Sequence, residues 1–361
     1  MSFQLNSISL LQFKNYTNRS FLFPKKVVAI CGKNGVGKTN ILDAIYYLCF
    51  TKSYFSNTDM VNVQQGARGF RIDGVFEQNG HTESAACILR ETGKKEFSVN
   101  GELYDKFSKH IGRYPCVIIA PDDAVLITGS SEERRGFMDA LLSQLDPEYL
   151  RQLILYNKLL QQRNSFLKAA AESGSLDESL LAVLDEQLVP AGNFIFNKRR
   201  DAMVAFLPRV KRMYTEIAQR EEHLSLLYES RLLEAGFDEL LKAARQKDLV
   251  LQRTTLGIHR DDITLQLGNQ PFKNIASQGQ RKSLLFALKL TELELLAAEK
   301  KFTPLLLLDD VFEKLDEDRI SSLLAQVCTG MDGQVFITDT NKERVLQHMQ
   351  AIDVEVHLVE L

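Results

Sequence analysis

At residues 32–39 the chain reads Gly32-Lys33-Asn34-Gly35-Val36-Gly37-Lys38-Thr39, which fits the pattern G-x-x-x-x-G-K-[ST] of a phosphate-binding loop. The apolar run at 27–30 is typical of a buried strand, and residues 40–48 are typical of a helix. Glycines let backbone N–H groups converge on phosphate oxygens at the positive end of a helix. A plain glycine turn is the alternative, but the strand–loop–helix context favours a nucleotide site. We therefore predict that all eight residues bind nucleotide, with Lys38 on the β- and γ-phosphates and the Thr39 hydroxyl on Mg²⁺.

A second motif, at residues 305–310, is an apolar run that ends in Asp309 and Asp310. In a phosphate-loop enzyme such a strand places its first acid near Mg²⁺, so we predict that Asp309 binds the metal. Asp310 is then positioned to act as general base for the attacking water. By itself the motif is more typical of a core strand that meets a solvated acidic turn. Its coupling to the loop at 32–39 favours the catalytic interpretation.

A third motif, Ser277-Gln278-Gly279-Gln280, precedes a run with the apolar spacing of a helix. Ser277 and Gln280 fit a helix-capping box. The same helix end could bind a γ-phosphate through the Ser277 side chain and the Gly279 amide. Because the two interpretations are compatible, we predict that Ser277, Gln278, Gly279 and Gln280 all contribute to nucleotide binding.

Length and composition indicate an ordinary globular protein. The 361 residues are enough for two or three domains, and 45% are hydrophobic and 25% charged. No apolar run is long enough for a membrane span, and the first residues do not resemble a signal peptide. Five scattered cysteines favour a reducing, cytoplasmic location and argue against disulfides or a zinc site. The net charge of −3 means that any DNA contact must come from a local basic patch.

The pattern of the chain changes twice along its length. Residues 1–120 are rich in strand patterns, with a hairpin turn predicted at Asn100-Gly101. Helical spacing dominates from about 132 to 247, with a loop at 171–175, breaks near Pro190 and Pro208, and no sustained heptad repeat. Strand and helix patterns then alternate, which favours a parallel sheet. We predict one discontinuous α/β domain, residues 1–120 and 250–361, interrupted by a helical arm at 121–249.

The three motifs, in this order, resemble the ATPase heads of the ABC superfamily and especially its SMC-like branch. Further runs are similar to the RecF family of that branch: Phe13-Lys14-Asn15-Tyr16, Pro121-Asp122, Leu126-Ile127-Thr128-Gly129, Arg134-Arg135-Gly136-Phe137-Met138-Asp139 and Thr254-Thr255-Leu256-Gly257-Ile258-His259-Arg260-Asp261-Asp262. The chain departs from the usual pattern in five places. Ser131 stands where a proline is usual, and Asp43 stands where a glutamate is common. Asp310 replaces a glutamate base, which implies slow turnover; Thr338-Asp339-Thr340 stands where a switch histidine is usual; and Glu313-Lys314-Leu315-Asp316 differs from the common Ser/Ala-Glu-Leu-Asp.

The resemblance implies an ABC-type P-loop ATPase head with an inserted all-helical arm and no long coiled coil. In such proteins two heads sandwich two ATP molecules, each between the phosphate loop of one copy and the signature run of the other. The resemblance therefore implies an ATP- and Mg²⁺-dependent homodimer that binds double-stranded or gapped DNA. It further implies support of recombinase loading in gap repair and replication restart, RecR and RecO as partners, and weak, DNA-stimulated hydrolysis that resets the clamp.

Several charged residues keep two interpretations. The candidates for DNA contact are Lys198, Arg199, Arg200, Arg209, Lys211 and Arg212, which are equally typical of a solvated helix face. Arg134-Arg135 could bind DNA or anchor the arm to the head. His259 could be a buried structural histidine or a nucleotide or DNA contact. Asp122 and Asp123 could line the nucleotide or cap the next helix.

Three other classes of function share the phosphate loop. A small-molecule kinase would not need the Ser-Gln-Gly-Gln run. A transporter ATPase subunit would need a membrane partner, and the long insertion argues against it. A nucleotide-binding scaffold without hydrolysis would not need Asp309 and Asp310.

Overall fold

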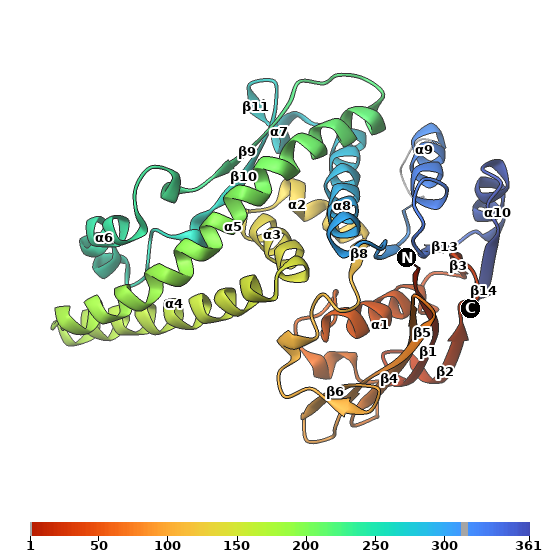
Figure 1. The fold of residues 1–361 in the computed structure, drawn as a ribbon, viewed down its shortest axis with the longest axis horizontal. Helices are drawn as coiled ribbons and strands as arrows, with labels where there is room; N and C mark the ends of the chain where they lie inside the picture. The colour runs from red at the N-terminus through yellow and green to blue at the C-terminus, as the bar shows by residue number, and fades with distance from the viewer. Residues whose placement is uncertain (1, 312–316) are drawn as a thin grey trace. The chain divides into compact units, whose positions relative to one another are not determined.

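The computed structural model describes residues 2–311 and 317–361, and its internal contacts divide the chain into two units (Figure 1). The first comprises Met1–Asp123, Glu216–Gln219 and Gln278–Leu361, and the second comprises Ala124–Thr215 and Arg220–Ser277. Residues 250–277, which we expected in the head, therefore belong to the second unit. The reason is pairing: β10 (Asp262–Leu267) pairs with β9 (Leu224–Glu229) along its whole length. The departure at 313–316 lies outside the described residues.

A five-stranded parallel sheet is the centre of the first unit. Its order is β14-β3-β13-β12-β8, with all neighbours parallel. The strands are β14 (Val356–Glu360), β3 (Val27–Cys31), β13 (Val335–Asp339), β12 (Leu305–Leu308) and β8 (Cys116–Ile119). Strands β3, β13, β12 and β8 are buried along their whole length, as their continuous apolar runs predict. The helices of this unit are α1 (Lys38–Phe50), α8 (Gln278–Lys300), α9 (Glu317–Cys328) and α10 (Lys342–Ala351).

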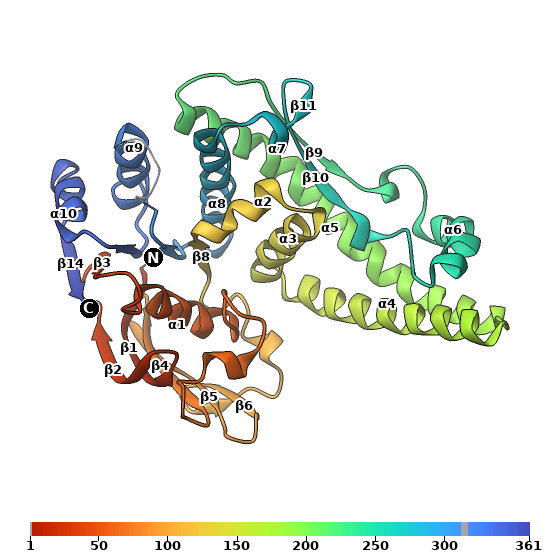
Figure 2. The ribbon, with the colours of Figure 1, turned by 180° about the vertical axis from the view of Figure 1, so that it is seen from behind.

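An antiparallel sheet of order β2-β1-β4-β5-β6-β7 completes the first unit (Figure 2). Its strands are β1 (Phe3–Phe13), β2 (Tyr16–Leu22), β4 (Phe70–Gln78), β5 (His81–Leu89), β6 (Lys95–Val99) and β7 (Glu102–Leu103). The predicted turn at Asn100-Gly101 joins β6 to β7, and both residues have the positive φ values, 51° and 82°, that such a tight turn requires. Short 3-10 helices occur at η1 (Asp59–Asn62), η2 (Phe107–Lys109) and η3 (Pro121–Ala124).

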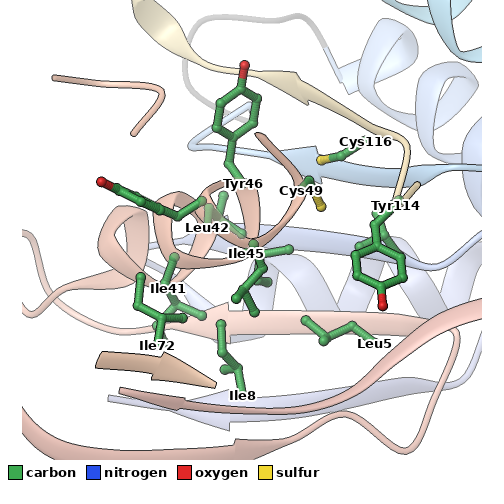
Figure 3. Close-up of a cluster of buried hydrophobic side chains, with 14 of the residues drawn as sticks. Leu5, Ile8, Ile41, Leu42, Ile45, Tyr46, Cys49, Ile72, Tyr114 and Cys116 are labelled. Carbon is green, nitrogen blue, oxygen red and sulfur yellow. The ribbon is translucent and has the colours of Figure 1, made fainter. Parts of the chain in front are cut away.

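Helix α1 forms the main core of the first unit by packing against both sheets. Figure 3 shows Ile41 and Ile45 directed toward Ile8 and Ile72 of the antiparallel sheet. On its other side, Cys49 of α1 lies near Cys116 of β8. Burial of one such aliphatic side chain stabilises the fold by about 1.5–3 kcal/mol. The helix that follows the phosphate loop is thus held rigidly at its base.

The second unit is mainly helical, but it is not all-helical as we expected. Its helices are α2 (Val125–Thr128), α3 (Ser131–Leu145), α4 (Pro147–Ser173), α5 (Glu178–Ala218), α6 (Phe237–Leu251) and α7 (Phe272–Ile275), with 3-10 turns η4 (Arg231–Leu233) and η5 (Ile258–Arg260). A small antiparallel sheet of order β11-β10-β9 joins them, with β11 at Gln270–Pro271. Within residues 2–311 and 317–361, no helix combines the length and apolar character of a membrane span.

Helix α5 runs without interruption through Pro190 and Pro208, so the predicted breaks at these prolines are wrong. Each proline removes one backbone hydrogen bond, which costs about 3 kcal/mol in a helix interior. Buried neighbours flank both positions: Leu188 and Ala191 beside Pro190, and Val210 beside Pro208. Tertiary packing of these side chains offsets the local cost. The loop predicted at 171–175 is confirmed only in part: α4 continues to Ser173, and the chain leaves the helix at Gly174, which adopts the left-handed conformation with φ 68°.

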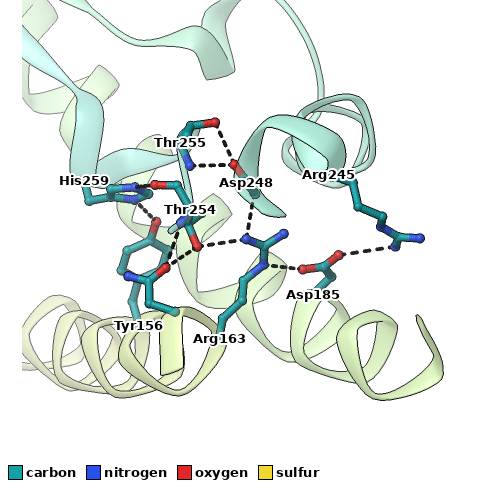
Figure 4. A network of polar contacts seen from close by, with 9 residues as sticks. Tyr156, Arg163, Asp185, Arg245, Asp248, Thr254, Thr255 and His259 are labelled. Carbon is teal, nitrogen blue, oxygen red and sulfur yellow. Dashed lines mark hydrogen bonds and ion pairs between the residues drawn. The ribbon is translucent and has the colours of Figure 1, made fainter. Parts of the chain in front are cut away.

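A buried polar network crosses the second unit (Figure 4). The Arg163 side chain is fully buried, and its guanidinium donates to Asp185 Oδ1 at 2.6 Å, Asp248 Oδ2 at 2.7 Å and Thr254 Oγ1 at 2.9 Å. Asp248 in turn accepts from the backbone and hydroxyl of Thr255. The network therefore ties α4, α5 and α6 to the segment that leads into β10.

Replacing Arg163 by Met is expected to lower the free energy of unfolding by about 3–5 kcal/mol, because it leaves the Asp248 carboxylate buried without its cation. Urea denaturation followed by circular dichroism measures the change. The matched control is Lys168→Met on the same helix, whose ion pair with Glu172 is exposed at 3.9 Å and should contribute less than about 1 kcal/mol. Equal midpoints for the two variants would contradict a stabilising role for the buried network.

Candidate nucleotide site

The phosphate loop connects β3 to α1 and depends on two glycines with left-handed backbones. Gly35 has φ 82° and Gly37, the N-cap of α1, has φ 114°. A Cβ atom on Gly37 would lie 2.6–2.8 Å from side-chain atoms of Asn15 and Tyr16, so only glycine fits there. The predicted strand–loop–helix arrangement is confirmed, and the loop opens at the positive end of α1.

Lys38 is held inside the loop rather than in solvent. Its side chain is buried, and Nζ donates to the carbonyl oxygens of Gly32 at 3.0 Å and Lys33 at 3.2 Å. These two contacts leave the third ammonium proton for another acceptor. A lysine in this position can neutralise a phosphate oxygen in the mouth of the loop.

Asp309 and Thr338, at the carboxyl ends of the adjacent parallel strands β12 and β13, meet Thr39 in the first turn of α1. Thr39 Oγ1 lies 3.0 Å from both carboxylate oxygens of Asp309, and Thr338 Oγ1 donates to Asp309 Oδ1 at 2.7 Å. Burial raises the pKa of Asp309, while the hydrogen bonds from Thr338 and Thr39 act in the opposite direction. Carboxylate and hydroxyl oxygens are the ligands that Mg²⁺ prefers, so this cluster fits the predicted metal pair Thr39 and Asp309.

Asp310 stands at the end of the same strand with its backbone fixed. Its φ of 44° is in the left-handed region, and its N–H donates to Thr338 Oγ1 at 2.9 Å. One threonine hydroxyl thus contacts both the Asp309 carboxylate and the Asp310 backbone. We did not anticipate this role for Thr338, because nothing in the local sequence shows that β13 lies beside β12.

The turn between β1 and β2 braces the loop from outside. Asn15 Nδ2 donates to the Val36 carbonyl at 2.8 Å, and Tyr16 Oη donates to the Gly37 carbonyl at 3.1 Å. Lys14 pairs with the buried Asp43 of α1 at 2.5 Å. The sequence predicts this turn only through the family resemblance. It does not predict the contacts with the loop, because the paired residues are 21 positions apart in the chain.

The signature run lies at the N-terminal end of α8, which begins at Gln278 as predicted. Ser277 and Gln278 are exposed, and Gly279 and Gln280 are partly buried. The structure brings the loop and the acidic strand together through Thr39 and Asp309, and the first two residues of the signature run are exposed to solvent.

Most of the proposed DNA-contact residues are already engaged. Arg199 is only 1% exposed and donates to Asp139, Asp261 and the Ile258 carbonyl, so its assignment to DNA is wrong. The exposed neighbours form weaker surface pairs: Lys198 with Asp146, Arg200 with Asp201 and Lys211 with Glu221. Arg209 and Arg212 are also exposed. Arg199 is instead a core residue of the second unit.

The other ambiguous residues have structural roles as well. Arg134 pairs with Asp262 at 2.6 Å, and Arg135 donates to the Asp261 carbonyl at 2.8 Å, both inside the second unit. The ring of His259 bonds to Tyr156 Oη and the Thr254 carbonyl, and burial lowers its pKa to about 4. It is therefore a neutral structural histidine at physiological pH.

Asp122 and Asp123 differ in their environment. Asp123 is buried, accepts from the Ala120 N–H at 2.8 Å and bonds to Tyr54 Oη, whereas Asp122 is exposed. The backbone contact of Asp123 closes the turn at the end of β8. Neither a nucleotide contact nor helix capping is needed to explain it.

Comparison with known proteins identifies the family. The RecF/RecN/SMC N terminal domain model matches residues 4–358. The DNA replication and repair protein RecF of Flavobacterium johnsoniae is 44% identical over 340 residues, which cover 94% of this chain and 95% of that protein. The RecF protein of Phocaeicola vulgatus is 41% identical over 353 residues, covering 97% of this chain and 94% of its own.

Solved structures agree with these relatives. A structure of the recombination mediator protein RecF with ATP has a TM-score of 0.87 and 29% identity, covering 94% of this chain and 93% of that chain. An Smc head domain from Pyrococcus furiosus, at 16% identity and a TM-score of 0.54, shares the fold. The expected α/β head of the SMC-like type, without a long coiled coil in the described residues, is thus confirmed. The chain belongs to the RecF family of DNA replication and repair proteins, a family of SMC-like ATPases.

Proposed function

We propose that ATP joins two copies of this chain into a clamp that binds double-stranded or gapped DNA. The observation that carries the proposal is the division of the site: a preformed phosphate loop meets the Asp309 cluster, while the signature run stands exposed at the start of α8. An exposed helix N-terminus attracts the phosphate of another molecule's nucleotide. Two copies arranged reciprocally would complete two sites, which is the symmetry expected of a homodimer.

The residues of the loop fit ATP with Mg²⁺. The backbone amides of 32–39 and the Lys38 ammonium would bind the phosphates, and Thr39 with Asp309 would hold the metal. When bound, Mg²⁺ neutralises charge on the β- and γ-phosphate oxygens. Thr338 keeps the Asp309 carboxylate oriented toward Thr39, since its hydroxyl donates to that group.

Hydrolysis assigns a separate role to Asp310. We propose that its carboxylate accepts a proton from the attacking water. Aspartate is one methylene shorter than glutamate, so its reach to that water is less favourable and turnover should be slow. Weak hydrolysis, stimulated by DNA, would remove the γ-phosphate that holds the two copies together and so reset the clamp.

Replacing Ser277 by Arg is expected to leave ATP binding to the monomer unchanged but to block dimer formation. The reason is that the exposed helix end would carry a bulky cation where the partner's phosphate must approach. Sedimentation velocity with ATP and Mg²⁺ measures pairing, and a fluorescent ATP analogue measures binding. Normal dimers of this variant would contradict the assigned role of the signature run.

A mixture of variants tests whether the two halves of a site come from different copies. Lys38→Ala lacks a working loop but keeps its signature, and Ser277→Arg has the converse defect. Mixing them creates one intact site in the heterodimer, so ATP should pair the mixture although it pairs neither variant alone. A mixture that stays monomeric while the wild type dimerises would show that both halves come from one chain.

DNA binding is proposed to use phosphate contacts that are insensitive to sequence. After the removal of Arg199 from the candidates, the exposed cations of α5 remain, namely Lys198, Arg200, Arg209, Lys211 and Arg212. The family resemblance further suggests RecR and RecO as partners in recombinase loading at gaps. The test of the DNA step is fluorescence anisotropy of gapped duplex with ATP, ADP or no nucleotide: tight binding with ATP alone supports the clamp, and equal affinities in all three states oppose it.

A further inference from the structure

A charged pair lies buried in the middle of the signature helix α8. Lys289 and Glu292 are 6% and 4% exposed, and Lys289 Nζ lies 3.8 Å from Glu292 Oε2. Within the described residues this carboxylate oxygen has no hydrogen-bond partner. Burial raises the pKa of Glu292 to about 7, because the buried site solvates a carboxylate poorly.

The pair faces the layer that carries the phosphate loop. Lys289 Nζ lies 5.7 Å from the ring centre of Tyr54, and the Tyr54 ring packs edge-on against Tyr46 of α1 at 4.9 Å. The backbone N–H of Tyr54 donates at 2.7 Å to Asp43, the α1 residue that anchors the β1–β2 turn. The Tyr54 hydroxyl bonds to Asp123, whose charge acts on both members of the pair. One set of polar contacts therefore connects α8 to the elements that brace the loop.

Stability alone does not account for a buried pair of this kind. Apolar residues of similar volume are often as stable or more stable than a buried ion pair, because two charges must be desolvated. Polar pairs in such places can instead specify one packing arrangement among several. Lys289 follows Gln278 by about three turns, or roughly 16 Å along the helix axis. A tilt of about 4° at this anchor would move the signature end by about 1 Å, an error that can reduce a catalysed rate about 100-fold.

We propose that Lys289 and Glu292 are positioning residues, which fix the angle of α8 so that its signature end meets the γ-phosphate on a second copy. The inference rests on the proposed ATP-joined dimer. The two residues touch neither nucleotide nor metal in this scheme; they act through the helix that carries Ser277 and Gly279. Their effect should appear in pairing and kcat, and not in the binding of ATP to one chain.

The test is the double variant K289M/E292L, which removes both charges together and leaves Asp123 with its contacts to Ala120 and Tyr54. We expect a midpoint of urea unfolding close to that of the wild type or below it, because the buried Asp123 keeps its hydrogen bonds but loses the nearby positive charge of Lys289. We expect the affinity of the monomer for ATP to stay within twofold, while kcat and the association constant of the ATP-bound dimer fall at least tenfold. A folded double variant that pairs and turns over within twofold of the wild type would overturn the proposal.

Two further variants make the result unambiguous. The control E148Q/R151Q removes an ion pair of the same i,i+3 spacing that is exposed on α4, and it should change none of the readouts. If K289M/E292L does not fold, Glu292→Gln, which keeps the shape of the side chain, takes its place with the same criteria. A wild type that never pairs with ATP overturns the proposed function as well; a wild type that pairs, with Ser277→Arg blocked and the double variant normal, overturns the positioning role alone.

Discussion

Replacing Lys38 by Ala is expected to weaken ATP binding by about 100-fold or more and to abolish ATP-dependent pairing and DNA binding. The variant loses the charge-assisted hydrogen bonds from Lys38 to the β- and γ-phosphates, and each such bond contributes about 1.5–3 kcal/mol to binding. It also loses the two bonds that Nζ makes to the Gly32 and Lys33 carbonyls, which hold the loop closed. Isothermal titration calorimetry measures the affinity, and sedimentation measures pairing.

The same loop supplies the control. Lys33 is exposed, and its contribution to phosphate binding comes through the backbone amide, so Lys33→Ala should keep ATP affinity within about threefold. A thermal melt checks that both variants remain folded. Retained ATP-driven dimers of Lys38→Ala would reject the phosphate loop as the site that controls assembly.

Replacing Asp310 by Asn is expected to lower kcat by about 10²–10⁴-fold while ATP binding stays nearly unchanged. The amide cannot accept the proton of the attacking water, but Asp309 still supplies the charge for the metal. Asparagine also tolerates the left-handed backbone at this position, where φ is 44°, so the strand end should keep its shape. The variant should therefore accumulate as an ATP-bound dimer, visible by sedimentation long after the wild type has returned to monomer.

The neighbouring acid gives the contrast for this prediction. Asp309→Asn should weaken the binding of ATP with Mg²⁺, because the carboxylate beside Thr39 is lost, and it should yield few dimers. Unchanged turnover in Asp310→Asn would exclude it as the base. If Asp309→Asn and Asp310→Asn changed ATP binding, turnover and dimer formation equally, the assignment of Asp309 to the metal and Asp310 to proton transfer would be contradicted.

The parts of the site that lie in short continuous runs were predictable from sequence. The phosphate loop is recognisable from glycines whose backbone angles other residues rarely adopt. The acidic strand is recognisable from the apolar run that precedes its two aspartates. The turn at Asn100-Gly101 was predictable for the same local reason. In each case the chemistry is set by residues next to one another in the chain.

The parts that depend on distant partners were not predictable. In its local sequence Arg199 resembles a surface cation. It is buried because it pairs with Asp139 and Asp261, which are 60 and 62 residues away in the sequence and so give no local signal. The role of Thr338 can be predicted only if it is known that β13 lies beside β12 in the sheet. The sheet of β9 and β10 was not predicted, because helix α6 separates its two strands in the sequence. The continuity of α5 through its prolines was not predicted either, because it depends on tertiary packing and not on neighbouring residues.

The central claim is that the terminal phosphate of ATP joins two copies of the chain. Sedimentation equilibrium of the wild-type protein with Mg²⁺ and either ATP or ADP tests it directly, with Asp310→Asn included to prevent loss of ATP. The account predicts a particle of 41.0 kDa with ADP and twice that mass with ATP. A mass that stays at that of a single chain with ATP, at protein concentrations well above those that support DNA binding, would contradict it.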